Sequence, residues 1–162
     1  MDLIGKARKI KLLVMDCDGV LTDGRLYFSA NGEELKVFHV RDGQGLVSWH
    51  QAGFRSGIIS GRNSPIVEIR GRQLGVEFIY QGREEKVGAL NEIAASANLD
   101  LDEIAYIGDD VPDAAVITLA GLGVAVADAV DETKAAADFV TASRGGCGAV
   151  RELIDMIMAA KN

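Results

Sequence analysis

The sequence contains few of the residues that characterise secreted, zinc-binding or membrane proteins. Only two cysteines, Cys17 and Cys147, occur among its 162 residues, and they form no CxxC pair. This argues against a disulfide framework and a cysteine-ligated zinc site, and it favours a reducing compartment. No apolar run approaches the roughly 20 residues of a membrane-spanning helix, and the first ten residues lack the apolar segment of a signal peptide. We therefore expect a cytoplasmic protein with no membrane partner.

Positive charge is also scarce. The chain has 17 Lys and Arg against 24 Asp and Glu, a net charge of −7, which argues against binding to nucleic acid. An anionic substrate remains compatible with this charge, because a few arginines or a metal ion reverse its sign inside one cleft. With 48% apolar and 25% charged residues, the chain is typical of a globular protein with one full core. We expect a single domain over residues 1–162.

Short apolar runs alternate with helical patterns along the chain. Several of these runs are hydrophobic throughout, which is typical of parallel strands that are covered on both faces. The expected strands are residues 11–16, 55–60, 77–80, 104–108 and 123–127. Helices are expected over residues 43–52, 64–74, 84–97, 111–120 and 149–159. The alternation predicts a three-layer α/β sandwich with a parallel, Rossmann-like sheet and right-handed crossovers.

One segment, residues 25–40, interrupts this alternation. It contains two β-like runs around Asn31 and Gly32, residues that favour a tight turn. The expected β-hairpin follows the first strand directly, where it could reach over a site or pair with a neighbouring subunit. No segment is long enough to form a separate cap domain.

Two acids, Asp16 and Asp18, end the apolar run of the first strand. Burying an unpaired charge costs several kcal/mol, so a carboxylate at the end of a buried strand indicates a function. Spaced by one residue, the two side chains can share one small site. Asp16 could attack an electrophile while Asp18 handles a proton, which suggests phosphoryl transfer through an aspartyl-phosphate.

The other strands also end in polar residues. Ser60 follows the second strand, Lys86 lies beyond the third, and Asp109 follows the fourth. In a parallel sheet of this kind, ligands bind at the carboxyl ends of the strands. Because several carboxylates at one edge repel one another, we expect a divalent cation there, and an oxygen-only set of ligands favours Mg²⁺. The expected ligands are the carboxylates of Asp16 and Asp109 and the backbone carbonyl of Asp18.

The remaining polar residues of this edge fit the same chemistry. Lys86 would offset charge that develops on the transferred phosphoryl group, and Ser60 would donate a hydrogen bond to it. Asp113 is expected to hold the cation through water or to orient its ligands, and Asp110 to support the same cluster. For Asp109, Asp110 and Asp113 the alternative is a purely structural role at the start of a helix.

The motifs DxDGVLTDG, ISGR, a downstream lysine and GDDxxD resemble the four motifs of the haloacid dehalogenase superfamily of phosphohydrolases. More narrowly, the segments NGEELKVFHVRDGQG, YQGREEK, GLGVAVADA and GGCGAVREL resemble the branch that acts on 3-deoxy-D-manno-octulosonate 8-phosphate. This resemblance implies a Mg²⁺-dependent phosphatase with a capless core. It also implies a homotetramer whose neighbouring subunits help to enclose the site, and a role in making the inner-core sugar of lipopolysaccharide.

Within this resemblance, Arg62 and Arg70 are the expected substrate-binding residues. Phosphatases that act on sialic-type nonulosonate 9-phosphates tend to have Glu at the position of Arg62, so arginine there favours the eight-carbon sugar acid. Two guanidinium groups suit a sugar-acid carboxylate or phosphate. Two alternatives remain: a nonulosonate 9-phosphate phosphatase, and a receiver-like phosphate-binding module, which would have no use for the acid at Asp18.

Two further features are open to more than one interpretation. The glycine-rich segment 145–148 is either a flap over a neighbouring site or a plain loop before the last helix. Cys17 lies between the two acids and, by the two-residue period of a strand, is expected to point into the core.

Overall fold

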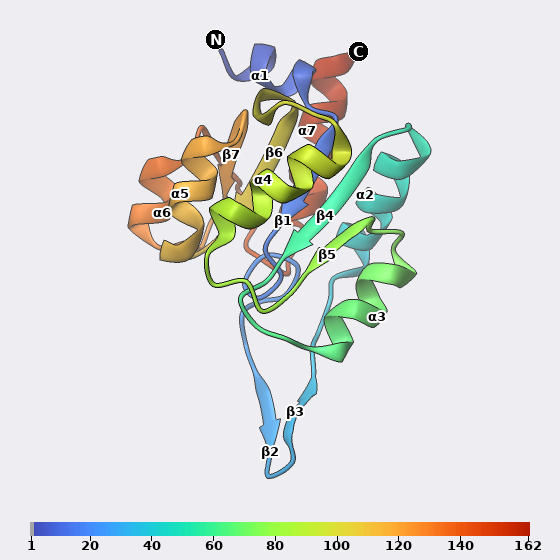
Figure 1. The fold of residues 1–162 in the computed structure, drawn as a ribbon, viewed down its shortest axis with the longest axis vertical. Helices are drawn as coiled ribbons and strands as arrows, with labels where there is room; N and C mark the ends of the chain where they lie inside the picture. The colour runs from blue at the N-terminus through green and yellow to red at the C-terminus, as the bar shows by residue number, and fades with distance from the viewer. Residues whose placement is uncertain (1) are drawn as a thin grey trace.

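Six parallel strands form the central sheet of the computed structural model, which describes residues 2–162 (Figure 1). Their order across the sheet is β5-β4-β1-β6-β7-β8. The strands are β1 (Leu12–Met15), β4 (Arg55–Ile59), β5 (Phe78–Tyr80), β6 (Ile104–Gly108), β7 (Leu122–Ala125) and β8 (Phe139–Val140). The strand order changes direction at β1, because β4 and β5 are added on one side of it and β6, β7 and β8 on the other. Such a switch point is where open α/β sheets bind their ligands.

Helices cover both faces of this sheet and make it the middle of three layers. One face carries α1 (Leu3–Lys9), α2 (Val40–Gln51), α3 (Pro65–Gln73) and α7 (Ala149–Lys161), whose buried residues join one hydrophobic cluster. The other face carries α4 (Lys86–Ala97) and α5 (Val111–Leu119), with α6 (Asp131–Ala136) beside α5. A short 3₁₀ helix, η1 (Leu101–Glu103), leads into β6. The three-layer α/β architecture predicted from the sequence is confirmed.

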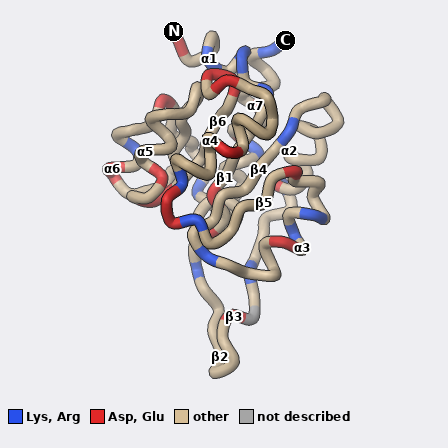
Figure 2. Tube along the Cα trace, in the orientation of Figure 1, with Lys and Arg blue, Asp and Glu red and all other residues tan. Residues whose placement is uncertain are grey.

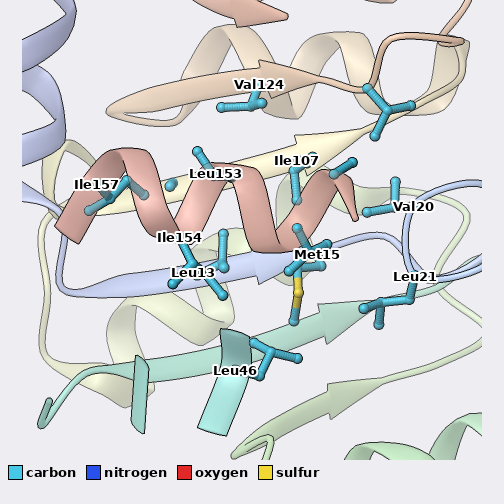
Figure 3. Packing of buried hydrophobic residues seen from close by; sticks show 14 of the residues in the cluster. Leu13, Met15, Val20, Leu21, Leu46, Ile107, Val124, Leu153, Ile154 and Ile157 are labelled. Atoms are coloured by element: carbon cyan, nitrogen blue, oxygen red, sulfur yellow. The ribbon is translucent and has the colours of Figure 1, made fainter. Parts of the chain in front are cut away.

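Both faces of β1 are apolar because its side chains alternate between two faces of the sheet that are each covered by helices. Leu13 and Met15 point into the cluster with α7, whereas Leu12 and Val14 point into the cluster with α4. Figure 3 shows the first pair packed beside Leu153, Ile154 and Ile157 of α7. Each fully buried Leu or Ile stabilises the fold by about 1.5–3 kcal/mol. The sheet is therefore a rigid support for whatever follows its strands.

The expected hairpin is present, with shorter strands than its sequence suggests. β2 (Tyr27–Ser29) and β3 (Gly32–Leu35) pair antiparallel, and Gly32 has φ 104°, which the tight turn requires. Figure 1 shows the hairpin extending beyond the end of the sheet that is opposite to the two termini. The second strand ends at Leu35, residues 36–39 are irregular, and Val40 already belongs to α2.

Four short elements were not predicted from the sequence: α1, α6, β8 and η1. None of them has more than seven residues, which is too short for a periodic pattern of apolar residues to be recognised. Helix α2 also begins three residues before the expected Gly43, since the Nδ1 atom of His39 accepts a hydrogen bond from the Arg41 backbone and caps it. None of the helices among residues 2–162 is both long enough and apolar enough to cross a membrane.

Candidate active site

A cavity of about 410 Å³ opens at the carboxyl ends of β1, β4 and β6, next to the start of α4. Figure 2 shows acidic and basic stretches of the chain close together in this region, between the sheet and the hairpin. All predicted site residues except Arg70 line the cavity. The lining consists of Asp16, Asp18, Ser60, Gly61, Arg62, Glu84, Lys86, Asp109, Asp110, Pro112 and Asp113. These residues therefore lie together at one edge of the sheet, as expected from their positions after the strands.

The turn after β1 directs its acids toward the cavity. Asp16 still donates its backbone N–H to Ile107 of β6 at 3.1 Å, and its Oδ1 accepts a hydrogen bond from the Cys17 backbone at 2.7 Å. Gly19 has φ 90°, and a Cβ at this position would lie 2.0 Å from Oδ2 of Asp109. Glycine thus allows the carboxylate of Asp109 to approach the turn, and Cys17 packs into the core as predicted.

Asp16 and Asp109 crowd one another. Burial, together with the neighbouring carboxylate of Asp113, raises the pKa of Asp16 to about 6, although Lys86 opposes this. Burial and the proximity of Asp16 raise the pKa of Asp109 to about 9. Oxygens of Asp16, Asp109 and Asp113 lie within 4.8 Å of one another, and Oδ1 of Asp109 is buried without a hydrogen-bond partner. Such a group of carboxylates fits a hard divalent cation.

Asp113 is the most completely bonded of these acids. Its fully buried carboxylate accepts hydrogen bonds from Tyr106 Oη at 2.6 Å and Lys86 Nζ at 2.7 Å, and from the backbones of Asp109 and Asp110 at 3.0 and 3.2 Å. With its oxygens used in this way, Asp113 orients the cluster rather than offering a free ligand atom. Tyr106 was not predicted, and the only signal for it is a hydroxyl inside an apolar strand.

Lys86 connects Asp113 to Asp16. Its Nζ lies 3.2 Å from Oδ1 of Asp16, and its side chain is 5% exposed. Burial lowers the pKa of Lys86, but the two carboxylates outweigh burial and the pKa is raised. The lysine is therefore a fixed positive charge beside Asp16. Asp110 lies at the cavity mouth, where its Oδ1 caps α5 through the Val111 backbone at 2.8 Å.

Asp18 belongs to a second group of charges that includes two residues not predicted from the sequence. Lys36 Nζ lies 2.6 Å from Oδ1 of Asp18 and 3.3 Å from Glu33. Arg62 contributes from the other side, with its Nε 3.8 Å from Oδ2 of Asp18 and its Nη2 3.3 Å from Glu33. Ser64 Oγ donates to Glu33 at 2.9 Å. Lys36 and Glu33 thus connect the hairpin to the site.

Arg70 is not brought together with the other predicted residues. Its guanidinium lies over the ring of Phe38, 5.7 Å from the centroid, and donates to Gln73 at 2.8 Å. These contacts lie on the side of α3 that faces the start of α2, where a Cβ on Gly43 would come within 2.8 Å of the guanidinium. Arg70 does not line the cavity.

The glycine-rich segment 145–148 packs against the turn that follows β1. The Gly146 backbone donates to Val20 O at 2.8 Å, and a Cβ on Gly145 would lie 1.7 Å from the carbonyl oxygen of Gly19. Oδ1 of Asp128 accepts from the Gly145 backbone at 2.9 Å. The segment therefore supports the turn that carries Asp16 and Asp18.

Comparison with known proteins identifies relatives along the full chain. Residues 54–154 match the family described as haloacid dehalogenase-like hydrolase. The chain is 43% identical over 160 residues to the 3-deoxy-D-manno-octulosonate 8-phosphate phosphatase of Escherichia coli K12, an alignment that covers 99% of this chain and 85% of the relative.

Two solved structures are also similar. The phosphatase of Moraxella catarrhalis, solved with magnesium, phosphate and the sugar acid KDO, has a TM-score of 0.96 and 41% identity, with 98% of this chain and 91% of that chain covered. The cobalt-bound phosphatase of Haemophilus influenzae has a TM-score of 0.94 and 42% identity, with 96% and 91% covered.

Proposed function

The chain belongs to the haloacid dehalogenase-like hydrolases, in the family of the 3-deoxy-D-manno-octulosonate 8-phosphate phosphatases, and we propose that it hydrolyses this sugar phosphate to the free sugar acid and phosphate. The product is the inner-core sugar of lipopolysaccharide. The observation that carries the proposal is the cavity itself, in which Asp16, Asp18 and Asp109 meet the buried Lys86.

The phosphatase is Mg²⁺-dependent. The carboxylates of Asp16 and Asp109 and the backbone carbonyl of Asp18 would hold the ion, and the crowding of Asp16 with Asp109 and the unpartnered Oδ1 of Asp109 fit it. Mg²⁺ supplies positive charge that lets two carboxylates and a phosphate share one site. Asp113 would keep Asp109 and Lys86 in position, through the hydrogen bonds that it accepts from both.

In the first step, a carboxylate oxygen of Asp16 attacks phosphorus as the bond between phosphorus and the sugar oxygen breaks. Asp18 gives its proton to that oxygen, so the sugar acid leaves as an alcohol and Asp18 becomes a carboxylate. Lys86 and Ser60 stabilise the charge on the phosphoryl oxygens. The product on the protein is an aspartyl-phosphate.

In the second step, Asp18 takes a proton from a water molecule that attacks the same phosphorus. The bond from phosphorus to Asp16 breaks, so inorganic phosphate is released and the carboxylate of Asp16 is regenerated. One residue thus acts first as acid and then as base, which returns Asp18 to its protonated form.

Arg62 is the proposed contact for the anionic groups of the substrate. Its side chain is 46% exposed and lines the cavity next to Asp18, so it has room to turn toward a carboxylate. A guanidinium can bind such a group through two parallel, charge-assisted hydrogen bonds.

The chain is further proposed to work as one cytoplasmic domain that assembles into a homotetramer, with the hairpin at residues 25–40 closing the site. Apolar side chains on and beside the hairpin support a subunit contact, because Phe28 is 60%, Val37 52% and Val40 77% exposed. Size-exclusion chromatography with light scattering tests this, since a tetramer is expected and a monomer would contradict it.

A substrate panel tests the function. Phosphate release is measured from 3-deoxy-D-manno-octulosonate 8-phosphate, from a nonulosonate 9-phosphate and from p-nitrophenyl phosphate, each with Mg²⁺. The highest kcat/KM is expected for the eight-carbon substrate. A preference for the nonulosonate would overturn the weight placed on Arg62, and no turnover of any of the three would reject the phosphatase.

A further inference from the structure

Lys36 is a buried cation that the proposed chemistry does not use. Its side chain is 1% exposed, although it leaves from the end of β3 at the base of an otherwise exposed hairpin. A buried ammonium group is costly unless it is paired and hydrogen-bonded. Lys36 meets this condition through Asp18 at 2.6 Å and Glu33 at 3.3 Å, and an apolar residue would serve packing alone equally well.

The two oxygens of Asp18 lie in different surroundings because of this contact. Oδ1 accepts a hydrogen bond from Lys36, whereas Oδ2 lies toward Arg62, at 3.8 Å, a residue that lines the cavity. Lys36 itself does not line the cavity. Lys36 therefore binds Oδ1 of Asp18 from outside the cavity and leaves Oδ2 for the proton transfer.

Lys36 is itself held in place. Glu33, which is 13% exposed, bonds to Lys36 and also accepts a hydrogen bond from Ser64 Oγ at 2.9 Å. Ser64 precedes α3 at its N-cap position. Glu33 therefore connects Lys36 to the start of α3, and this contact fixes the position of Lys36.

We propose that Lys36 is a positioning residue for Asp18, fixing one carboxylate oxygen so that the other faces the leaving oxygen of the substrate. This inference rests on the proposed function, in which Asp18 is the acid and base. A misplacement of about 1 Å in such a group can cost roughly 100-fold in rate, out of the roughly 10²–10⁴-fold that a general acid supplies.

The test compares two leaving groups in Lys36→Met. A sugar phosphate needs a proton on its leaving oxygen, whereas 2,4-dinitrophenolate leaves without one. For 3-deoxy-D-manno-octulosonate 8-phosphate, kcat is expected to fall about 10- to 100-fold, with KM changed by no more than about threefold. For 2,4-dinitrophenyl phosphate, the rate of the first, pre-steady-state release of dinitrophenolate is expected to stay within about threefold of the unaltered protein.

Two variants act as controls, and a third replaces Lys36→Met if it does not fold. Lys9→Met removes a surface lysine that pairs with Asp102 and is expected to change neither rate. Lys36→Arg keeps the cation and is expected to recover part of the lost kcat on the sugar phosphate. If Lys36→Met fails to fold, as judged by circular dichroism, Lys36→Gln is measured in its place and must show the same selective loss.

The outcomes separate this inference from the proposed function. Equal losses on the two substrates, an unchanged kcat on the sugar phosphate, or a loss confined to KM would each overturn the role of Lys36 while the phosphatase stands. An unaltered protein that releases phosphate from neither substrate would reject the proposed function, and the inference with it.

Discussion

The carboxylate of Asp113 offers a quantitative test of how the site is built. It is fully buried, and it accepts hydrogen bonds from Tyr106, Lys86 and two backbone N–H groups at 2.6–3.2 Å. Asp113→Asn keeps the shape but places an NH₂ group where one oxygen accepted two of these bonds. Whichever way the amide turns, two donors lose their acceptor.

The expected cost follows from these contacts. A buried donor without a partner costs about 1–3 kcal/mol. Lys86 keeps its second contact, to Asp16 at 3.2 Å, and the loss of the negative charge of Asp113 removes its repulsion of Asp16 and Asp109. We expect a net loss of about 2–4 kcal/mol in the free energy of unfolding. For a chain of this size that corresponds to a decrease in Tm of roughly 4–16 °C.

The assay is urea unfolding in EDTA, followed by circular dichroism, with Asp155→Asn as the matched control. Asp155 pairs with Arg151 at 2.9 Å on the surface, and its side chain is 61% exposed. An exposed pair of this kind contributes less than about 0.5 kcal/mol. If Asp113→Asn unfolds at the same urea concentration as Asp155→Asn, Asp113 does not hold the site together and this account of it is wrong.

Three more predictions concern the cation, the substrate and the turn after β1. Without Mg²⁺, the pKa values of Asp16 and Asp109 are raised in the folded protein, so these two groups bind more protons there than in the unfolded chain between about pH 4 and about pH 9. The Tm in EDTA is therefore expected to fall as pH rises through this range, and Mg²⁺ is expected to remove the trend. Arg62→Ala is expected to raise KM for the sugar-acid phosphate about 10- to 100-fold while p-nitrophenyl phosphate is affected much less, as steady-state kinetics would measure. Gly145→Ala places a Cβ 1.7 Å from the carbonyl oxygen of Gly19, so we expect a loss of about 1–3 kcal/mol in urea unfolding and a lower kcat.

Each of these has an outcome that would count against it. A Tm in EDTA that rises with pH between about 5 and about 8 would contradict the crowding of the acids. An equal rise in KM for both substrates would show that Arg62 acts on the phosphate alone or on Asp18. Arg70→Ala, measured in parallel, decides whether the predicted Arg70 contact exists, since a matching rise in KM would establish it. An unaltered unfolding curve for Gly145→Ala would mean that the loop does not support the turn.

Strand-end residues could be predicted from the sequence because a parallel sheet fixes where they meet. Asp16, Ser60 and Asp109 directly follow apolar strands, and Lys86 begins the helix after a fourth, so their shared edge follows from topology alone. The chemistry then follows from residue types, since crowded carboxylates next to a lysine suit a cation and a phosphoryl group.

Lys36, Glu33 and Tyr106 could not be found in this way. Lys36 and Glu33 lie in a hairpin, and only the path of the chain in space brings them to Asp18. Tyr106 reaches Asp113 from within a buried strand, where its hydroxyl has no periodic signal. Arg70 was predicted to bind substrate but does not line the cavity. Its position in the sequence of α3 does not show that its guanidinium lies over Phe38.

The most direct test of the account is phosphate release from 3-deoxy-D-manno-octulosonate 8-phosphate by the unaltered protein and by Asp16→Asn, each with Mg²⁺ and with EDTA. The unaltered protein is expected to turn over with Mg²⁺ and to stop in EDTA. Asp16→Asn is expected to release no phosphate in either case, because an amide cannot form the aspartyl-phosphate. Appreciable turnover by Asp16→Asn, or turnover by the unaltered protein that persists in EDTA, would contradict a metal-assisted reaction through Asp16.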